Sequence, residues 1–229
     1  MGEIIPENDP VRIVMDATFF KRGDGYLVAR ANSRNLHWFP IETEKVEHYG
    51  RCLHTLEAAG FTFASFTIDG RRGVRKLLQK LYPHVPIQHC QYHQLQTITQ
   101  KLTQRPKLEA SKELRAIALT ISKTTRREFT EDLIAWYEKW GDFIKERTES
   151  SDLKRKWRWK HERLRSAYCS LRRNLLWLFT CLDHPELNIP NTTNSCDGSF
   201  AHWKNKVILH RGMKQHRKKK MIDFLLEDL

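Results

Sequence analysis

The sequence predicts an α/β protein with a mixed sheet, followed by a largely helical region. Two observations support this fold class. In the first hundred of the 229 residues, β-rich apolar runs alternate with helical periods in the order β-β-β-α-β-α-β. From about residue 94 the pattern becomes helical, with little Gly or Pro until Pro185. A chain of this length can bury a substantial core, as one large domain or two small ones.

Three runs rich in β-branched and aromatic residues predict the first three strands, at 11–20, 26–31 and 36–41. Gly23 and Gly25 indicate the turn between the first two. Pro40 lies in the third run. Because Pro has no N–H to donate to a neighbouring strand, we expect this strand to end there or to lie at an edge of the sheet.

The next elements alternate between helix and strand. Apolar residues from position 46 recur at helical spacing until Gly60. Residues 61–68 (FTFASFTI) form the strongest strand pattern in the chain. A helix over 73–81 and a short strand over 85–90 complete this part.

The second half predicts helices over 94–103, 108–122, 126–147 and 152–182, and a further helix starts near Asn194. Trp157 and Trp159 lie among basic residues in the longest of these helices. A spacing of two would place them on different helix faces. Stacking on splayed DNA bases and packing within the helical region are both open interpretations.

Charge is unevenly distributed. Lysine and arginine number 40 against 27 acidic residues, a formal net charge of +13. Residues 151–173 hold nine basic and two acidic residues, and residues 198–222 hold eight basic residues and no acid. Localised basic charge indicates a polyanionic partner, most often nucleic acid. A charged, solvated helical surface is the alternative.

Several protein classes are excluded by the composition and motifs. The chain has no run of 18 apolar residues and no signal-peptide pattern, so we expect neither a membrane span nor a membrane partner. Its five cysteines are scattered, which favours a reducing, cytoplasmic compartment over a disulfide framework. P-loop, dinucleotide-binding and zincin motifs are absent.

Two aspartates stand at strand positions where a carboxylate is unusual. Asp16 interrupts an apolar strand, and Asp69 directly follows the FTFASFTI strand. Acids at the ends of neighbouring strands converge on one edge of a sheet, where a divalent cation relieves their repulsion. The alternatives are a solvent-facing strand position for Asp16 and a turn or helix-capping role for Asp69.

Asp197 is the third candidate acid, in the first turn of the helix near Asn194. Thr193 or Asn194 can cap that helix, and an acid three residues after Asn194 suits a capping box. In the functional interpretation, Asp197 faces the two strand-end acids. Ala201, Lys204 and Ile208 then follow on the same side of the helix, and Lys204 suits a phosphate held there.

Cys90 and His93 form a C-x-x-H pair at the end of the last predicted strand. Alone, such a pair is half of a zinc site, and no second pair completes it. The simpler interpretation is a structural motif, with a buried Cys beside a helix-capping His.

Four segments, taken together, resemble the Mutator-type transposases of bacterial insertion sequences, over residues from about 11 to 213. The segments are VMDATFF, TIDGRRG, HCQYHQ and NTTNSCDGSFAHWKNKVILHRGM. The family has an Asp on its first strand, which matches Asp16. It has an Asp-Gly after its fourth strand, which matches Asp69 and Gly70. Its C-x-x-H or D-x-x-H motif matches Cys90 and His93.

The family then has a helical insertion and a T-T-N-x-x-E motif. Thr192, Thr193 and Asn194 match this motif, Asp197 stands where the family has Glu, and His210-Arg211-Gly212 resembles the family's H-R-G. The resemblance implies an α/β, RNase H-like mixed-sheet core in the order β-β-β-α-β-α-β-α, with a large all-helical insertion before the last catalytic helix. The implied division is 1–100 for the first part of the core, 101–190 for the insertion, 191–213 for the last catalytic helix and 214–229 for a basic C-terminal tail.

The resemblance also implies a DDE-type transposase that cleaves insertion-sequence ends and joins them to target DNA. Asp16, Asp69 and Asp197 would be the catalytic residues and the ligands of two Mg²⁺ or Mn²⁺ ions, about 4 Å apart. The partner would be double-stranded DNA, bound by a homo-oligomer in the bacterial cytoplasm, at the nucleoid. The basic stretches supply the candidate DNA-binding residues Lys204, Lys206, Arg211, Arg155, Lys156, Arg158, Trp157 and Trp159.

Family members usually carry a DNA-recognition region before the first strand, so we expect this chain to be truncated at its N-terminus. Other functions remain open. They are an inactive DNA-binding remnant, an RNase H-like nuclease or resolvase without strand transfer, and a helical interaction module that accounts for the second half only.

Overall fold

The computed structural model describes residues 9–149, 156–210 and 212–227, without the side chains at positions 197–199, 201–202 and 215. The chain forms two compact units. The first comprises Met1–Cys90 and His184–Leu229, and the second comprises Gln91–Asp183. These boundaries fall at 90 and 183, where the sequence predicted 100 and 190.

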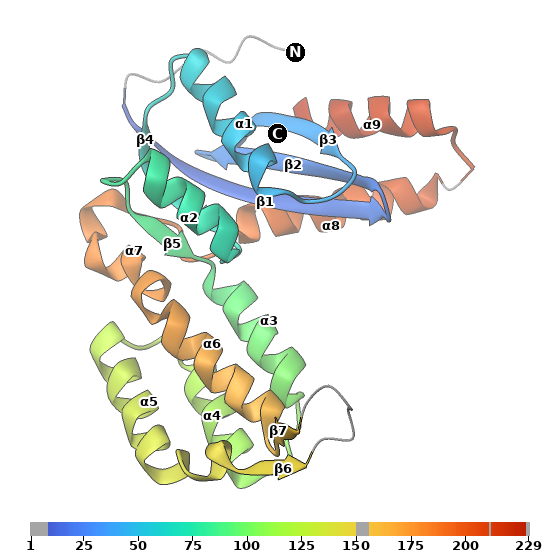
Figure 1. The fold of residues 1–229 in the computed structure, drawn as a ribbon. Coiled ribbons are helices and arrows are strands. Elements are labelled where there is room, and N and C mark those ends of the chain that lie inside the picture. Colours follow the sequence, from blue (N-terminus) through green and yellow to red (C-terminus); the bar gives the residue numbers. More distant parts are fainter. Residues whose placement is uncertain (1–8, 150–155, 211, 228–229) are drawn as a thin grey trace. The chain divides into compact units, whose positions relative to one another are not determined.

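The first unit contains a mixed five-stranded sheet in the order β3-β2-β1-β4-β5, as Figure 1 shows. Strands β1, β2 and β3 are antiparallel neighbours, whereas β4 and β5 run parallel to β1. The α/β class and the predicted order of its first seven elements are therefore confirmed, and β3, which contains Pro40, is an edge strand. The elements before the second unit are β1 (Val11–Lys21), β2 (Asp24–Ala31), β3 (Arg34–Ile41), α1 (Val46–Ala58), β4 (Phe63–Ile68), α2 (Arg72–Leu81) and β5 (Ile87–His89).

Helices cover both faces of this sheet (Figure 1). Side chains alternate between the faces of a strand, so Val14 and Val28 face one side, whereas Met15 and Leu27 face the other. Val14 and Val28 pack in one apolar cluster with Cys196, Phe200, Trp203 and Val207, which recur at helical spacing along α8 (Asn194–Leu209). Helix α1 packs against β2 and β3, and α2 packs against α1. The strands are thus buried on both faces, which explains their continuous apolar sequence.

Helix α9 (Gln215–Glu227) joins α8 on the same face, where Ile222, Leu225 and Leu226 are buried in that cluster. The Asn35 side-chain amide donates a hydrogen bond of 2.9 Å to the carbonyl of Leu226. The sequence predicted only a basic tail over 214–229, because its lysines and arginines dominate the composition. The apolar residues of this segment, Ile222, Leu225 and Leu226, lie on one face of a helix and pack against the sheet.

Asp223 of α9 is a titratable group where this helix packs on the sheet. Its carboxyl group is hydrogen-bonded to Tyr26 and Trp38, and burial raises its pKa above the usual 3.8. A raised pKa favours folding while the group is protonated, and this contribution is lost as the pH rises through the folded-state value. We therefore expect Asp223→Asn to unfold at a higher temperature than wild type at pH 7, with a gap that closes as the pH falls towards 4. A gap independent of pH, measured by circular dichroism, would contradict this assignment.

The second unit is built mainly of helices (Figure 1). Its apolar core includes Leu114, Trp136 and Leu171, which are nearly or completely buried, and the ring of Trp136 stacks on Tyr168. Thr125 and Glu128 form a capping box at the start of α5. The helices are α3 (Gln91–Leu102), α4 (Glu109–Leu119), α5 (Arg126–Trp140), α6 (Glu162–Leu178) and α7 (Thr180–Asp183), with the 3₁₀ turn η1 (Phe143–Lys145). A second 3₁₀ turn, η2 (Pro185–Leu187), begins the return to the first unit.

The prediction of an all-helical insertion, with helices over 126–147 and 152–182, is wrong in its central part. Helix α5 ends at Trp140, and β6 (Arg147–Glu149) pairs antiparallel with β7 (Trp157–Trp159). The alternation of Trp and Arg in WRW has the period of two that is typical of a strand, although the surrounding basic residues had favoured a charged helix. The indoles of Trp157 and Trp159 therefore share one face of a hairpin, whereas the helical interpretation placed them on different faces.

Across the described ranges, none of the helices combines the length and the apolar character needed to cross a membrane.

Candidate functional site

The sheet brings Asp16, which lies within β1, near Asp69, which directly follows the neighbouring parallel strand β4. Val14 of β1 is the register partner of Thr67 in β4, and each aspartate comes two residues later. Adjacent strands are about 4.8 Å apart, so the two acids lie near one another just beyond the last β1–β4 pair, where β4 ends and β1 continues. Asp16 is only 6% exposed and lies on the face where Val14 and Val28 contact α8. The predicted proximity of the two acids is thus consistent with the register, but Asp16 lies in the middle of β1 and only Asp69 follows a strand end.

A tight turn fixes Asp69. One carboxylate oxygen, Oδ1, accepts the backbone N–H of Arg71 at 3.0 Å, and Gly70 between them has a φ of +84°. A Cβ atom at Gly70 would lie 1.9 Å from Nε2 of the buried His89 ring, so both the backbone conformation and the space require glycine. The turn role that sequence left open for Asp69 is therefore present, and Oδ2 is 3.6 Å from the Arg71 side chain.

Glu44 and Tyr49 belong to the same site, and sequence reasoning missed both. Arg71 reaches the Glu44 carboxylate at 2.7 Å and donates to the Glu44 carbonyl at 3.1 Å. The Tyr49 hydroxyl donates to the other Glu44 oxygen at 2.6 Å. Since β3 runs parallel to β1, the Glu44 loop after β3 reaches the same edge as Asp69. These contacts join positions up to 27 residues apart, and no local pattern reveals them.

Three carboxylates act on the Tyr49 hydroxyl. Burial raises the pKa of Tyr49 well above its usual value, and the negative charges of Glu44, Asp69 and Asp16 raise it further. The shift is thus an electrostatic sign that Asp16 and Asp69 share one neighbourhood with Glu44. Two of these carboxylates, Glu44 and Asp69, already have the Arg71 guanidinium beside them.

Cys90 anchors the start of α8 to the same edge of the sheet. It is fully buried directly after β5, and its sulfur accepts the Thr193 N–H at 3.3 Å and the Thr193 hydroxyl at 3.5 Å. Thr67 of β4 donates to the Pro190 carbonyl at 2.9 Å. Both bonds fix the segment leading into α8 beside the strands that present Asp16 and Asp69.

We expect Cys90→Ala to lower the free energy of unfolding by about 1–3 kcal/mol, because it removes the acceptor of a buried N–H. Cys90→Ser keeps an acceptor and should lose less. Urea denaturation of both variants measures the difference. Equal losses would mean that the sulfur acts through its volume alone.

His93, the other half of the C-x-x-H pair, lies in the first turn of α3 in the second unit, with its ring 6.1 Å from that of Tyr92. The division of the chain falls between Cys90 and His93. The structure therefore favours a structural role for Cys90, which anchors the start of α8.

Asp197 lies in the first part of α8. Thr193 is the N-cap of this helix. In a capping box the third residue after the N-cap bonds back to it, and that residue is Cys196, whereas Asp197 is the fourth. The capping-box alternative built on Asn194 therefore does not apply. Cys196, Phe200 and Trp203 form the apolar stripe of α8 that packs on the sheet face of Asp16. Position 197 is next to Cys196 and is therefore rotated by about 100° around the helix axis from that residue. Its side chain is outside the described set.

Among the side chains that the structure describes, no three His, Cys, Asp or Glu residues form a group able to hold a metal ion. That set contains Asp16 and Asp69 but not the Asp197 carboxylate.

The candidate DNA-binding residues fall in two separate places. Lys204 and Lys206 are half-buried residues of α8 in the first unit. Lys156 and Arg158 are exposed at the β6–β7 hairpin of the second unit, with Trp157 and Trp159. Arg155 and Arg211 lie outside the described residues.

Comparison of the chain with protein-family models gives no match, and comparison with curated proteins gives none.

Proposed function

We propose that this protein is a DDE-type transposase catalytic domain that cleaves DNA strands at insertion-sequence ends and transfers them to target DNA. One observation carries the proposal. Asp16 and Asp69 each come two residues after the register pair Val14–Thr67 of the parallel strands β1 and β4. Helix α8, which carries Asp197, packs on the face of the sheet that contains Val14.

The topology of the first unit supports an RNase H-like core. A mixed sheet of three antiparallel strands followed by two parallel ones, built in the chain order β-β-β-α-β-α-β, supports the core that the resemblance to Mutator-type transposases implies. The second unit interrupts the first between β5 and α8, as expected of an insertion.

The residues at the site fit Mg²⁺ or Mn²⁺. Carboxylate oxygens are the hard ligands that both ions prefer, and the charges of Asp16 and Asp69 both act on the pKa of Tyr49. Asp16, Asp69 and Asp197 would hold the ions. When bound, such ions activate a water or a DNA 3′-hydroxyl as nucleophile and stabilise the leaving oxygen.

The remaining side chains prepare the acids for this role. The Arg71 N–H and guanidinium orient the Asp69 carboxylate, and Glu44 in turn holds the guanidinium, with Tyr49 donating to Glu44. Cys90 and Thr193 fix the start of the helix that carries Asp197. The chain thus orients its ligands through backbone turns and hydrogen bonds, and a misplacement of 1 Å in such a site can cost about 100-fold in rate.

DNA affinity should fall steeply with salt, because Lys204, Lys206, Lys156 and Arg158 release counterions when they contact phosphates. Four such contacts on duplex DNA predict a slope of about −3.6 in a plot of log affinity against log salt concentration. Arg158→Ala should make the slope shallower by about 1. The matched control is Lys112→Ala, at an exposed lysine of the same unit that is paired with Glu109. Fluorescence anisotropy with a labelled duplex measures both, and a slope near zero would contradict the phosphate contacts.

The function is tested by incubating the protein with supercoiled plasmid and a labelled oligonucleotide duplex, in Mg²⁺, Mn²⁺ or EDTA. We expect nicks with 3′-hydroxyl ends in either metal, no nicks in EDTA, and covalent joining of the labelled 3′ end to the plasmid. Nicking without joining would indicate a nuclease or resolvase. DNA binding without nicking in either metal would indicate an inactive remnant and would overturn the proposal.

A further inference from the structure

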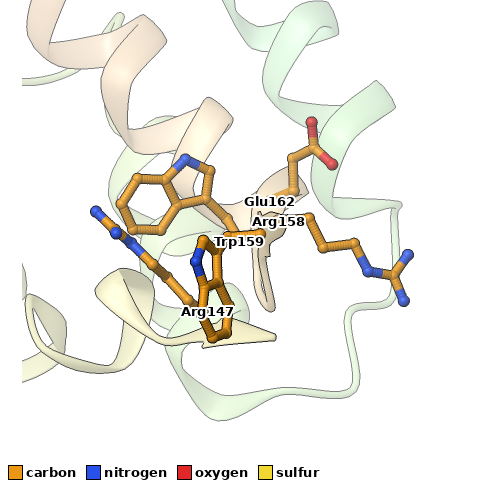
Figure 2. Close-up of a pocket in the computed structure, with 5 residues that line it drawn as sticks. Arg147, Arg158, Trp159 and Glu162 are labelled. Atoms are coloured by element: carbon orange, nitrogen blue, oxygen red, sulfur yellow. The ribbon is translucent and has the colours of Figure 1, made fainter. Parts of the chain in front are cut away.

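The β6–β7 hairpin presents aromatic and basic side chains on one face. Arg147 is the register partner of Trp159, and Glu149 is that of Trp157. Cross-strand partners and residues two apart share a face, so Trp157, Trp159 and Arg147 lie on the same side of the hairpin. Figure 2 shows Arg158, which alternates with the tryptophans, pointing away from Arg147.

The two indoles have different surroundings. The guanidinium carbons of Arg147 and Arg165 lie 4.8 and 4.0 Å from the ring centroid of Trp159, which is therefore held by two cations. Trp157 is 49% exposed, with the ammonium of Lys156 at 5.8 Å from its ring centroid. Trp159 is thus a fixed part of the hairpin, whereas Trp157 offers ring surface to a ligand.

A cavity of about 200 Å³ opens beside these residues (Figure 2). Its lining consists of Arg147, Trp157, Arg158, Trp159 and Glu162. This volume suits one planar ring and is too small for a duplex. The Glu162 carboxylate can accept a hydrogen bond from an N–H group of such a ring.

Charge restricts the ligand. An aromatic surface can bind cations, proline-rich peptides or nucleobases. Residues 151–173 carry nine basic and two acidic residues, so a cationic ligand is repelled. A ligand that combines a planar ring with negative charge meets both requirements, and a strand of nucleic acid has both in every unit.

We propose that this hairpin face binds an unpaired nucleobase of a nucleic-acid strand. The base stacks on Trp157, and Lys156 and Arg147 contact the flanking phosphates. The site rests on the nucleic-acid part of the proposed function and requires no bound metal. In a transposase, it would hold a base splayed from the duplex near a cleaved end.

The test measures binding of the full chain to a labelled twelve-residue oligothymidylate, in EDTA, by fluorescence anisotropy. The comparison ligand is an abasic strand of the same length and charge. Stacking contributes about 1–3 kcal/mol per base, so Trp157→Ala should weaken oligothymidylate binding by about 5- to 150-fold. Binding to the abasic strand should stay within twofold of wild type, and Trp157→Phe should restore most of the loss.

Leu176→Ala is the matched control, because this residue is an apolar side chain of the same unit that is 63% exposed and lies near the other end of α6. It should bind both ligands as wild type does. An equal loss on both ligands for Trp157→Ala, or no loss on oligothymidylate, would overturn the stacking site. Oligouridylate, tested in the same way, separates RNA from DNA as the ligand. Because no cleavage occurs in EDTA, this result is independent of whether the acids are catalytic.

Discussion

Asp16→Asn should reduce metal-dependent DNA nicking by at least about 100-fold, because it removes the charge of one of only three proposed metal ligands. Asparagine has nearly the same shape as aspartate and carries no charge to bury, so the sheet should fold as before. Rates of plasmid nicking in Mg²⁺ and in Mn²⁺ measure the effect, with thermal unfolding as the check on folding.

The matched control for this variant is Asp24→Asn. Asp24 is a buried aspartate of the same sheet, 7% exposed, and its register partner Lys21 lies five residues, or about 17 Å, beyond Asp16 along β1. The control should nick DNA at the wild-type rate. If Asp16→Asn and Asp24→Asn nick equally well, Asp16 has no catalytic role.

Gly70→Ala should lower the free energy of unfolding by roughly 2–5 kcal/mol, which makes it the largest stability effect expected from one methyl group in this chain. Part of the cost is the backbone conformation, with φ at +84°, and part is the overlap of the new Cβ with the buried His89 ring. The variant should also lose nicking activity, because Asp69 immediately precedes this residue.

Gly23→Ala separates the two costs. Gly23 has a similar φ of +75°, and a Cβ there would meet nothing within 4 Å. It should therefore lose only the backbone part, about 1–2 kcal/mol. Urea denaturation of both variants gives the comparison. Equal losses would show that His89 moves aside freely and that the turn holding Asp69 is not tightly packed.

Local sequence patterns were sufficient to predict most of the first unit. Alternating and continuous apolar runs predicted the strands, and Asp16 and Asp69 stood out because a carboxylate in or after an apolar strand needs a reason. The contribution of Glu44, Tyr49 and Arg71 could not be predicted, because it depends on which loops meet at the sheet edge.

The second half was predicted less well, for a different reason. Charged residues obscure the periodicity of KWRWKHERLR, and a run of three strand residues is too short to distinguish from a helix. The C-terminal helix was hidden in the same way, since its buried residues Ile222, Leu225 and Leu226 follow a run of basic ones. In both places the outcome was decided by tertiary packing.

The most direct test of the proposed site is a change of metal preference. Asp16→Cys replaces a hard carboxylate by a softer thiolate, which Mn²⁺ accepts better than Mg²⁺. If Asp16 binds the ion, this variant should nick DNA poorly in Mg²⁺ and recover in Mn²⁺, so that its ratio of Mn²⁺ to Mg²⁺ rates exceeds that of wild type and of Asp24→Cys. A ratio equal to that of wild type would contradict a metal site at Asp16, and with it the proposed chemistry.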